Sequence, residues 1–327
     1  MLNQLAPAHN PFLCEKMQSD NTPSRMYNYV RSRQLEGTFS SDPSVGAWIQ
    51  SGLRICKGWG SPTESEWPYD GKAANWPPVD PANIDDAAKE RRLLAYQRVR
   101  SLDECRRALA KGIPVTAALN ISAKDWGDSL TGDIPTPSSS ETDSGHSVLI
   151  VGYDEAEQKL KLRNSWGSDW GAKGYGQVNY DYFERFVSEA WIVFSDPRPH
   201  TTPSHNGVVE RTWGLVDCFA TSPLHCVELF DSTRDESIGW SFIVQRDGYA
   251  DIEELFVRPA YRERGYGSHL ADMVKSFSEF QGMEFRLWIG HVDARAVSSP
   301  MASQILRKLG LSIKTSSAHP WAAYLAV

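Results

Sequence analysis

The segment at residues 145–180 constrains the fold more than any other part of the chain. It reads GHSVLIVGYDEAEQKLKLRNSWGSDWGAKGYGQVNY. Three β-like runs, at 147–154, 159–167 and 175–180, are separated by short polar or Gly-containing connections. Short turns join strands that run antiparallel to each other. The sequence therefore predicts an antiparallel β portion in this part of the chain.

Helical patterns precede this β portion. Residues 24–37 and 44–60 read as helices, and Gly37 is a stop signal for the first of them. A third helix is expected at 102–112, where Ser101 can cap the N-terminus. Between this helix and the β portion we expect a strand and then a loop, at 113–121 and 125–145. Helices first and antiparallel strands second make an α+β layout.

A polar segment rich in proline divides the chain. Residues 197–207 read PRPHTTPSHNG and follow an apolar run at 190–194. Segments of this composition are natural interdomain linkers. We therefore predict one domain at 1–196 and a second at 208–327, both of ordinary domain size.

The second domain is expected to be β-rich at first and then mixed α/β. Its predicted elements are a hairpin, a strand, a helix, a strand, a helix and a final strand, at 227–248, 250–257, 265–282, 284–290, 300–310 and 322–327. Strands that alternate with helices favour a sheet with parallel neighbours.

The bulk properties exclude several classes of protein. The chain has 327 residues and a net charge of −7, so it offers no basic field for nucleic acid. No apolar run approaches the length of a membrane span, and the N-terminus lacks the two regions of a signal peptide. The five cysteines are scattered without CxxC spacing, which argues against a disulfide framework and a zinc site. We expect a cytoplasmic protein with no metal, no membrane partner and no nucleic-acid partner.

His146 and Asn164 carry the clearest chemistry. Asn164 lies in Asn-Ser-Trp-Gly and is followed by a second Trp-Gly pair, Trp170–Gly171, and by Gly-Tyr-Gly at 174–176. An imidazole that activates a thiol needs a group that orients it, and an Asn carbonyl can serve. The stretch at about 24–194 resembles the papain-like cysteine peptidase family, in which these motifs occur in this order. The resemblance implies that His146 and Asn164 are catalytic and that a peptide binds in a cleft.

The nucleophile of that family is not recognisable in the sequence. The family pattern places a Gln shortly before Gly-Ser-Cys-Trp, with the Cys opening a long helix. Counting back from the helix at 24–37, this cysteine is expected at or just before Met1. Cys14 is the other candidate, whereas Cys56 and Cys105 are expected to be core thiols. Two explanations stay open: a fragment or mis-started form of an active peptidase, or a degenerate and catalytically silent relative.

A second constellation lies at 257–270, which reads VRPAYRERGYGSHL. Backbone N–H groups at a helix N-terminus bind a pyrophosphate well, and glycines let the backbone approach closely. The string, within about 227–327, resembles the cofactor signature of the Gcn5-related N-acetyltransferase (GNAT) family. The resemblance implies an acetyl-CoA site made by Phe256, Val257, Arg262, Gly265, Tyr266, Gly267 and Ser268. Glu263 stands where the family often has Gly.

The same resemblance suggests the remaining parts of a transferase site. In that family the strand before the turn splays from its neighbour, and a Glu on this strand often acts as general base. Glu253 and Glu254 are the candidates, and by strand alternation only one of them points into the cleft. The family often has a Tyr on its last helix that protonates the leaving thiolate, but Leu306 stands at that position. The general acid is therefore absent, replaced by water or supplied elsewhere.

Together these patterns favour a two-domain enzyme, in which a papain-like peptidase domain is fused to an acetyl-CoA-dependent N-acetyltransferase domain. The expected acceptor is an amine of a small molecule, a peptide or a protein. Two alternatives stay open. Either the chain is an active cysteine peptidase whose nucleophile segment is missing here, or the papain-like part is non-catalytic and holds a peptide for the transferase.

Overall fold

The computed structural model describes most of the chain. The described residues are 22–40, 45–69, 80–127, 131–138, 142–195, 207–215, 219, 223–246, 248–289, 293, 299–315 and 324–326. They fall into two compact units, each assembled from separate stretches of sequence. Unit 1 lies within Met1–Met26, Thr63–Tyr69 and Tyr96–Pro197, and unit 2 within Tyr27–Pro62, Asp70–Ala95 and Arg198–Val327. The division of the chain into domains at 197–207 stays a prediction.

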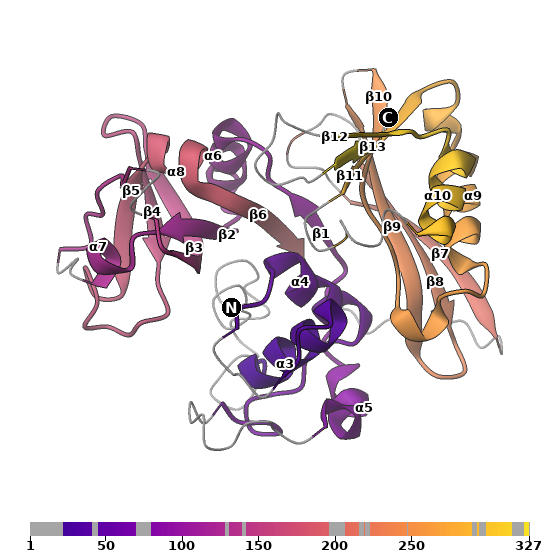
Figure 1. Cartoon of the computed structure of the whole chain (residues 1–327), viewed down its shortest axis with the longest axis horizontal. Coiled ribbons are helices and arrows are strands. Elements are labelled where there is room, and N and C mark those ends of the chain that lie inside the picture. Colours follow the sequence, from indigo (N-terminus) through magenta and orange to yellow (C-terminus); the bar gives the residue numbers. More distant parts are fainter. Residues whose placement is uncertain are drawn as a thin grey trace. The chain divides into compact units, whose positions relative to one another are not determined.

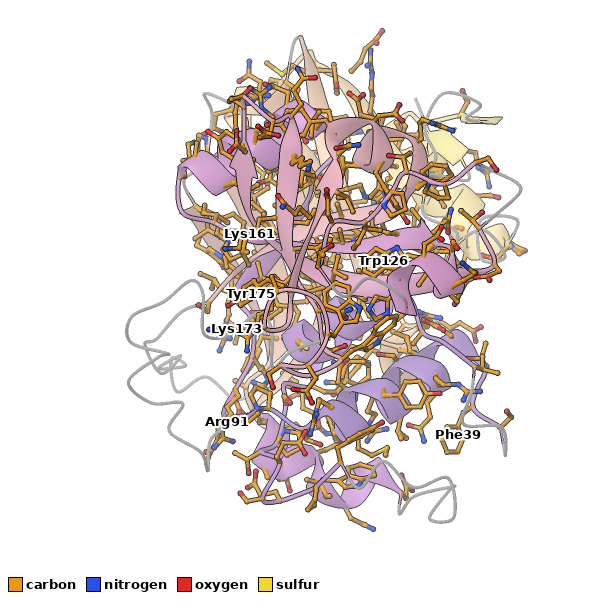
Figure 2. All side chains as sticks on the ribbon, turned by 90° about the vertical axis from the view of Figure 1, so that its left-hand side faces the viewer. Phe39, Arg91, Trp126, Lys161, Lys173 and Tyr175 are labelled. Carbon is orange, nitrogen blue, oxygen red and sulfur yellow. The ribbon has the colours of Figure 1, made fainter. Side chains whose placement is uncertain are left out.

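Unit 1 is built on a six-stranded sheet in the order β1-β6-β2-β3-β4-β5 (Figure 1). Its strands are β1 (Ala95–Arg98), β2 (Val115–Ile121), β3 (Ser144–Asp154), β4 (Lys159–Arg163), β5 (Tyr175–Asn179) and β6 (Val187–Phe194). Neighbours from β6 to β5 run antiparallel, which confirms the predicted β portion. Lys161 of β4 lies beside Tyr175 of β5, with its Nζ 5.1 Å from the ring centroid (Figure 2).

Three short helices accompany this sheet: α6 (Leu102–Ala110), α7 (Ala123–Gly127) and α8 (Tyr180–Phe186). The Ser101 side chain accepts a hydrogen bond from the Glu104 N–H at 3.1 Å, so α6 begins at the predicted cap. The sequence pattern predicts no helix at α7 or α8. The buried aromatic residues of α8, Tyr182, Phe183 and Phe186, show why it forms, because packing stabilises helices too short to be stable alone.

Unit 2 is built on a seven-stranded sheet in the order β12-β13-β11-β10-β9-β8-β7 (Figure 1). Its strands are β7 (Val208–Leu215), β8 (Leu224–Asp231), β9 (Glu236–Arg246), β10 (Tyr249–Val257), β11 (Glu284–Ile289), β12 (Ile313–Thr315) and β13 (Tyr324–Ala326). β10 and β11 run parallel, and the other pairs run antiparallel. This mixed sheet confirms the predicted α/β architecture.

Two helices, α9 (Tyr266–Ser276) and α10 (Pro300–Leu309), cover one face of this sheet (Figure 1). Their apolar side chains join those of the strands in one buried core, which includes Val227, Ile243, Ile252, Leu270, Val274 and Leu306. Two 3₁₀ turns flank α9: η4 (Pro259–Tyr261) and η5 (Ser278–Phe280). The predicted helix at 265–282 therefore ends early, at Ser276.

Unit 2 also contains helices from the first part of the chain: α3 (Arg25–Glu36) from Tyr27 onward, α4 (Ile49–Gly58), η3 (Pro81–Ile84) and α5 (Asp85–Ala88). α4 lies against β9. Leu255 and Val257 pack into the core beneath α9, so Phe256 between them points to the opposite face. Arg54 of α4 lies over the Phe256 ring on that face, 4.6 Å from its centroid. None of the described helices is long and apolar enough to cross a membrane.

Candidate functional sites

His146 and Asn164 are brought together within unit 1. His146 lies on β3 opposite Leu119 of β2. Asn164 directly follows β4, and its N–H donates to the carbonyl of Gly174 at 2.9 Å. The two strands hold His146 Nε2 at 2.7 Å from Asn164 Oδ1. This is the contact that an orienting amide makes with a catalytic imidazole.

The hydrogen bonds around Asn164 define the tautomer of His146. Asn164 Oδ1 also accepts the N–H of Ser165 at 2.7 Å, and a backbone N–H can only donate, so this atom is the amide oxygen. An amide oxygen can only accept, so Nε2 of His146 donates the proton of the shared bond. In the neutral ring, Nδ1 is then the unprotonated nitrogen and can act as a base.

Burial also favours the neutral ring. It lowers the pKa of His146, and the hydrogen bond to Asn164 offsets this only in part. A neutral imidazole with a free lone pair is the form that takes a proton from a thiol.

Aromatic rings surround the pair. The ring of Trp166 lies 4.7 Å from that of His146, and Trp126 meets the imidazole edge-on at 5.5 Å. Trp126 (Figure 2) is fully buried, and its Nε1 donates to the Tyr182 hydroxyl at 3.0 Å. Trp170 Nε1 donates to the Trp126 carbonyl at 2.7 Å. These rings limit the access of water to the bond between imidazole and amide.

Sequence reasoning missed Trp126 and Tyr182. Trp126 belongs to α7, at the start of a stretch that reads as loop, and Tyr182 belongs to the unpredicted α8. No local pattern marks either residue, because their role depends on the fold of the sheet between them.

The described cysteines do not supply a nucleophile. Cys56, Cys105 and Cys226 are free and buried, and burial raises the pKa of each thiol. A nucleophilic cysteine needs a lowered pKa and access to substrate. Cys56 and Cys105 are therefore core thiols, as predicted. Cys14 lies outside the described residues, so the position of the nucleophile stays a prediction.

In unit 2, β10 parts from its neighbour β11. β10 pairs with β9 from Tyr249 to Val257, with a single interruption at Glu253. Its pairing with β11 runs only from Tyr249 to Ile252, and no other described strand pairs with that side of residues 253–257. Backbone N–H and C=O groups on such an open edge can pair with an extended ligand. Phe256 and Val257 lie on this stretch.

The turn after β10 ends at the N-terminus of α9. Gly265 caps this helix with a φ of +83°, a left-handed conformation that glycine adopts without strain. Tyr266, Gly267 and Ser268 form the first turn of α9, whose backbone N–H groups have no acceptor within the helix. The helix start therefore presents a set of donors and the positive end of the helix dipole.

Arg262 and Gly267 complete this turn. Arg262 Nε donates to the carbonyl of Val257 at 3.0 Å, which ties the turn to the end of β10. Burial lowers the pKa of Arg262, and the nearby Arg54 adds to this effect. A Cβ on Gly267 would lie 2.6 Å from Ile305 Cδ1, so glycine permits the close approach of α9 to α10. The structure thus brings all seven cofactor-binding candidates together around one turn.

A β-bulge changes the orientation of the two candidate bases. The register between β10 and β9 shifts between Ile252 and Glu254. Asp251 pairs with Val244 and Glu254 pairs with Phe242. The two β9 residues are two positions apart and share a face, so Asp251 and Glu254 lie on the same face of the sheet.

Glu253 lies in this bulge and on the same face. Arg246 contacts both Asp251 and Glu253, through Nε at 3.3 Å and Nη2 at 3.1 Å. The expectation that Glu253 and Glu254 point to opposite faces is therefore wrong, because the bulge inserts one residue into the strand. Both carboxylates are buried and each has an arginine partner, Arg246 for Glu253 and Arg54 for Glu254.

The last predicted position is that of the general acid. Leu306 on α10 is buried in the apolar core and carries no proton to donate. Within the described ranges, no cluster of three or more His, Cys, Asp or Glu side chains could hold a metal ion.

Two family matches agree with these two sites. Residues 37–188 match the sequence model of the papain family cysteine proteases, and residues 183–298 match that of the acetyltransferase (GNAT) family. The chain combines a papain-like cysteine peptidase domain with a GNAT acetyltransferase domain. Both matched families are families of enzymes. The seven-stranded sheet of unit 2 is called the GNAT sheet below.

Known relatives resemble the papain-like domain. An uncharacterized peptidase C1-like protein of Acanthamoeba polyphaga mimivirus is 30% identical over 195 residues, which are 54% of this chain and 61% of the viral protein. Procathepsin L of Felis catus is 30% identical over 168 residues, or 47% of this chain and 46% of the relative. The chain therefore spans less than two thirds of either protein. The crystal structure of xylellain, a cysteine protease from Xylella fastidiosa, matches with a TM-score of 0.50 and 28% identity, covering 60% of this chain and 78% of that one.

Proposed function

We propose that the GNAT domain transfers the acetyl group of acetyl-CoA to an amine. The observation that carries this proposal is the parting of β10 from β11 after Ile252, directly before the turn that ends at the N-terminus of α9. The open edge at residues 253–257 suits an extended amide-containing arm. The N–H groups that begin α9 suit a pyrophosphate. A ligand with both features, joined as in CoA, matches this arrangement.

The chemistry requires few groups from the chain. Acetyl-CoA supplies a thioester: the amine nitrogen bonds to its carbonyl carbon, the C–S bond breaks, and the sulfur leaves as a thiolate. One proton must leave the amine, and Glu253 or Glu254 is the proposed acceptor. Water protonates the thiolate in this proposal, because Leu306 stands at the usual Tyr position. Arg262, Gly265, Tyr266, Gly267 and Ser268 would hold the pyrophosphate, and Phe256 and Val257 the pantetheine arm.

Acetyl-CoA binding can be tested by calorimetry and thermal unfolding. At about 100 times its Kd, acetyl-CoA should stabilise the protein by about 2.7 kcal/mol. Ser268→Asp should weaken binding about tenfold or more, because it places a negative charge beside the pyrophosphate. The same substitution favours the helix dipole of α9, so the ligand-free protein should lose no stability. Ser268→Ala is the matched control, and a wild-type protein that acetyl-CoA does not stabilise would overturn the proposal.

The acceptor is proposed to be an amine-bearing small molecule, peptide or protein in the cytoplasm, with no nucleic-acid or membrane partner. The net charge of −7 and the free, buried state of the described cysteines support this setting. Thiol release from acetyl-CoA with a panel of amines, followed by mass spectrometry of the products, identifies the class. Glu253→Gln and Glu254→Gln then separate the two candidate bases.

A specific observation also favours peptidase chemistry in the papain-like domain. The bond of 2.7 Å between His146 Nε2 and Asn164 Oδ1 leaves Nδ1 of a neutral imidazole available to a thiol. We infer that His146 and Asn164 are the base and the orienting group of a cysteine peptidase site, and that Cys14 is the candidate nucleophile within this chain.

A thiol-directed epoxide tests this inference on the full chain. Labelling that is lost in both Cys14→Ala and His146→Ala would support Cys14 as the nucleophile. Labelling that persists in Cys14→Ala would identify another thiol. If wild type is not labelled although a reference papain-type protease is, the pair is catalytically silent in this chain.

A further inference from the structure

Helix α4 has an unexpected partner. Residues 49–58 lie inside the stretch that matches the papain family, yet they belong to the same compact unit as the GNAT sheet. Close packing joins the two: a Cβ on Gly58 would lie 2.9 Å from the Trp240 ring of β9. Arg258, which follows β10, lies over the ring of Trp59, 4.1 Å from its centroid. The helix therefore contacts the sheet at the end of α4 as well as at Arg54.

Arg54 of α4 binds two carboxylates of the GNAT domain at once. Its Nε and Nη2 donate to Glu254 at 3.1 and 2.7 Å, and its Nη1 and Nη2 donate to Asp293 at 2.9 and 2.6 Å. Gln50, one turn earlier on α4, also donates to Glu254, at 3.2 Å. Arg54 is 2% exposed and Glu254 3% exposed, so solvent screens this pair very little.

The position of this network in the sheet indicates a role beyond stability, because it borders the opening between β10 and β11. Glu254 lies two residues after Ile252, the last β10 residue that pairs with β11, and Asp293 lies shortly after the end of β11. Arg54 therefore joins groups from the two sides of the opening between these strands. It also lies over the ring of Phe256, which Arg262 in the turn between β10 and α9 approaches at 5.6 Å.

Burial alone does not explain such a network. A buried ion pair recovers little more than its desolvation cost, and apolar residues of similar volume are often as stable. A planar guanidinium with two bidentate partners does fix the direction of each carboxylate. Burial lowers the pKa of Arg54, but Asp293 and Glu254 more than offset this effect and raise the pKa well above its usual value. The Arg54 side chain therefore stays positively charged.

We propose that Arg54 is a positioning residue of the acetyltransferase, supplied by a helix of the papain-like stretch. It orients the Glu254 carboxylate at the opening between β10 and β11, where the proposed thioester and amine meet. The inference rests on the proposed acetyltransferase function. It implies that the transferase site is complete only when the papain-like segment at 49–58 is present.

Lys57 provides a matched control on the same helix. Its Nζ lies 2.5 Å from Glu228 Oε1 on β8, and both side chains are buried. The pair resembles Arg54–Glu254 in burial and in charge. It differs in place, because β8 is separated from β10 by β9 and does not border the opening.

The experiment compares Arg54→Met with Lys57→Met in the full chain, using acetyl-CoA and the best amine found for wild type. Both variants should unfold at lower temperature. Only Arg54→Met should lose kcat, by about 100-fold, because a misplaced carboxylate no longer meets the reacting groups. The KM for acetyl-CoA should not change. Arg54→Lys keeps the positive charge but lacks the planar guanidinium that binds both carboxylates. It should recover kcat in part, to about tenfold below wild type.

The outcomes separate the two proposals. If wild type neither binds acetyl-CoA nor acetylates an amine, the proposed function fails, and the role of Arg54 fails with it. If wild type is active and Arg54→Met keeps its kcat, the positioning role is wrong while the function stands. An equal loss of kcat in Arg54→Met and Lys57→Met would also overturn it, since destabilisation would then explain both. Should Arg54→Met not fold, Arg54→Lys against Lys57→Met gives the same decision.

Discussion

His146 and Glu254 are both buried polar groups, but the protein holds them in different ways. His146 is oriented by one amide, Asn164, which lies 18 positions away in the sequence, and by aromatic rings around it. Glu254 is held by Arg54, which lies 200 positions away on a helix inside the stretch that matches the papain family. The first contact joins residues close in sequence and depends on neutral groups, whereas the second joins residues far apart in sequence and depends on an ion pair.

This difference shows that a family match and a packing unit need not coincide. The match to the papain family includes both α4 and the strands that carry His146 and Asn164. The contacts place α4 in one compact unit and those strands in the other. An ion network therefore makes part of one family's sequence a structural component of the other family's sheet.

The largest expected effect tests whether α4 belongs energetically to the GNAT sheet. Lys57→Met removes the cation nearest to the buried carboxylate of Glu228 and leaves Arg211 at 3.4 Å, so it should cost about 3 kcal/mol of unfolding free energy. Hydrogen exchange should show the loss in the amides of β8 and β9. The double variant Lys57→Met/Glu228→Leu removes both charges and should recover most of the stability. Loss confined to the amides of β2 and β3 would refute the assignment of α4 to this sheet.

The second prediction concerns the local site. The hydrogen bond from His146 to Asn164 raises the pKa of the imidazole against the effect of burial, so Asn164→Ala should lower it further. Asn164→Asp should raise it, because a carboxylate favours the imidazolium. A histidine NMR titration measures both. No change in either variant would mean that the bond of 2.7 Å is absent in solution.

The lowered pKa of His146 also sets the sign of a pH effect on stability. The folded state prefers the neutral ring, so this preference is fully satisfied above the ordinary imidazole pKa of about 6.5. As the pH falls below that value, the unfolded state binds the proton first and unit 1 loses stability. In Asn164→Asp the loss should be smaller, which denaturation at two pH values can check.

The same contrast explains what the sequence could predict. Asn-Ser-Trp-Gly, the cap at Ser101 and the Gly265 turn are local patterns, and the structure forms the expected β portion, helix start and helix-capped turn there. The roles of Arg54 and Asp293 depend on packing between distant segments, so no spacing predicts them. The alternation of side chains along a strand also does not predict the bulge at Glu253, since it assumes an uninterrupted strand.

A third prediction probes the aromatic surroundings of the local site. Trp126→Phe removes the donor to the Tyr182 hydroxyl and part of a fully buried ring, and should cost about 1–2 kcal/mol. The pKa of His146 should rise, because burial lowers this pKa and the smaller ring buries the imidazole less. Denaturant unfolding and the same NMR titration give the two values. Trp166→Phe, at a ring that is 43% exposed, is the control and should cost less.

The smallest expected effect lies in the turn between β10 and α9. Glu263 has a φ of +62°, a left-handed conformation that costs a non-glycine residue about 1–2 kcal/mol. Glycine adopts it freely but loses more chain entropy on folding, so Glu263→Gly should gain about 0.5–1 kcal/mol. Glu263→Ala keeps the strain and should gain nothing, although both variants remove the same negative charge. Tighter binding of acetyl-CoA by both variants would arise from that charge, whereas a gain in melting temperature by the glycine variant alone would arise from the backbone. Equal melting temperatures for the two variants would mean that the turn relaxes in solution and that its conformation is not fixed before the ligand binds.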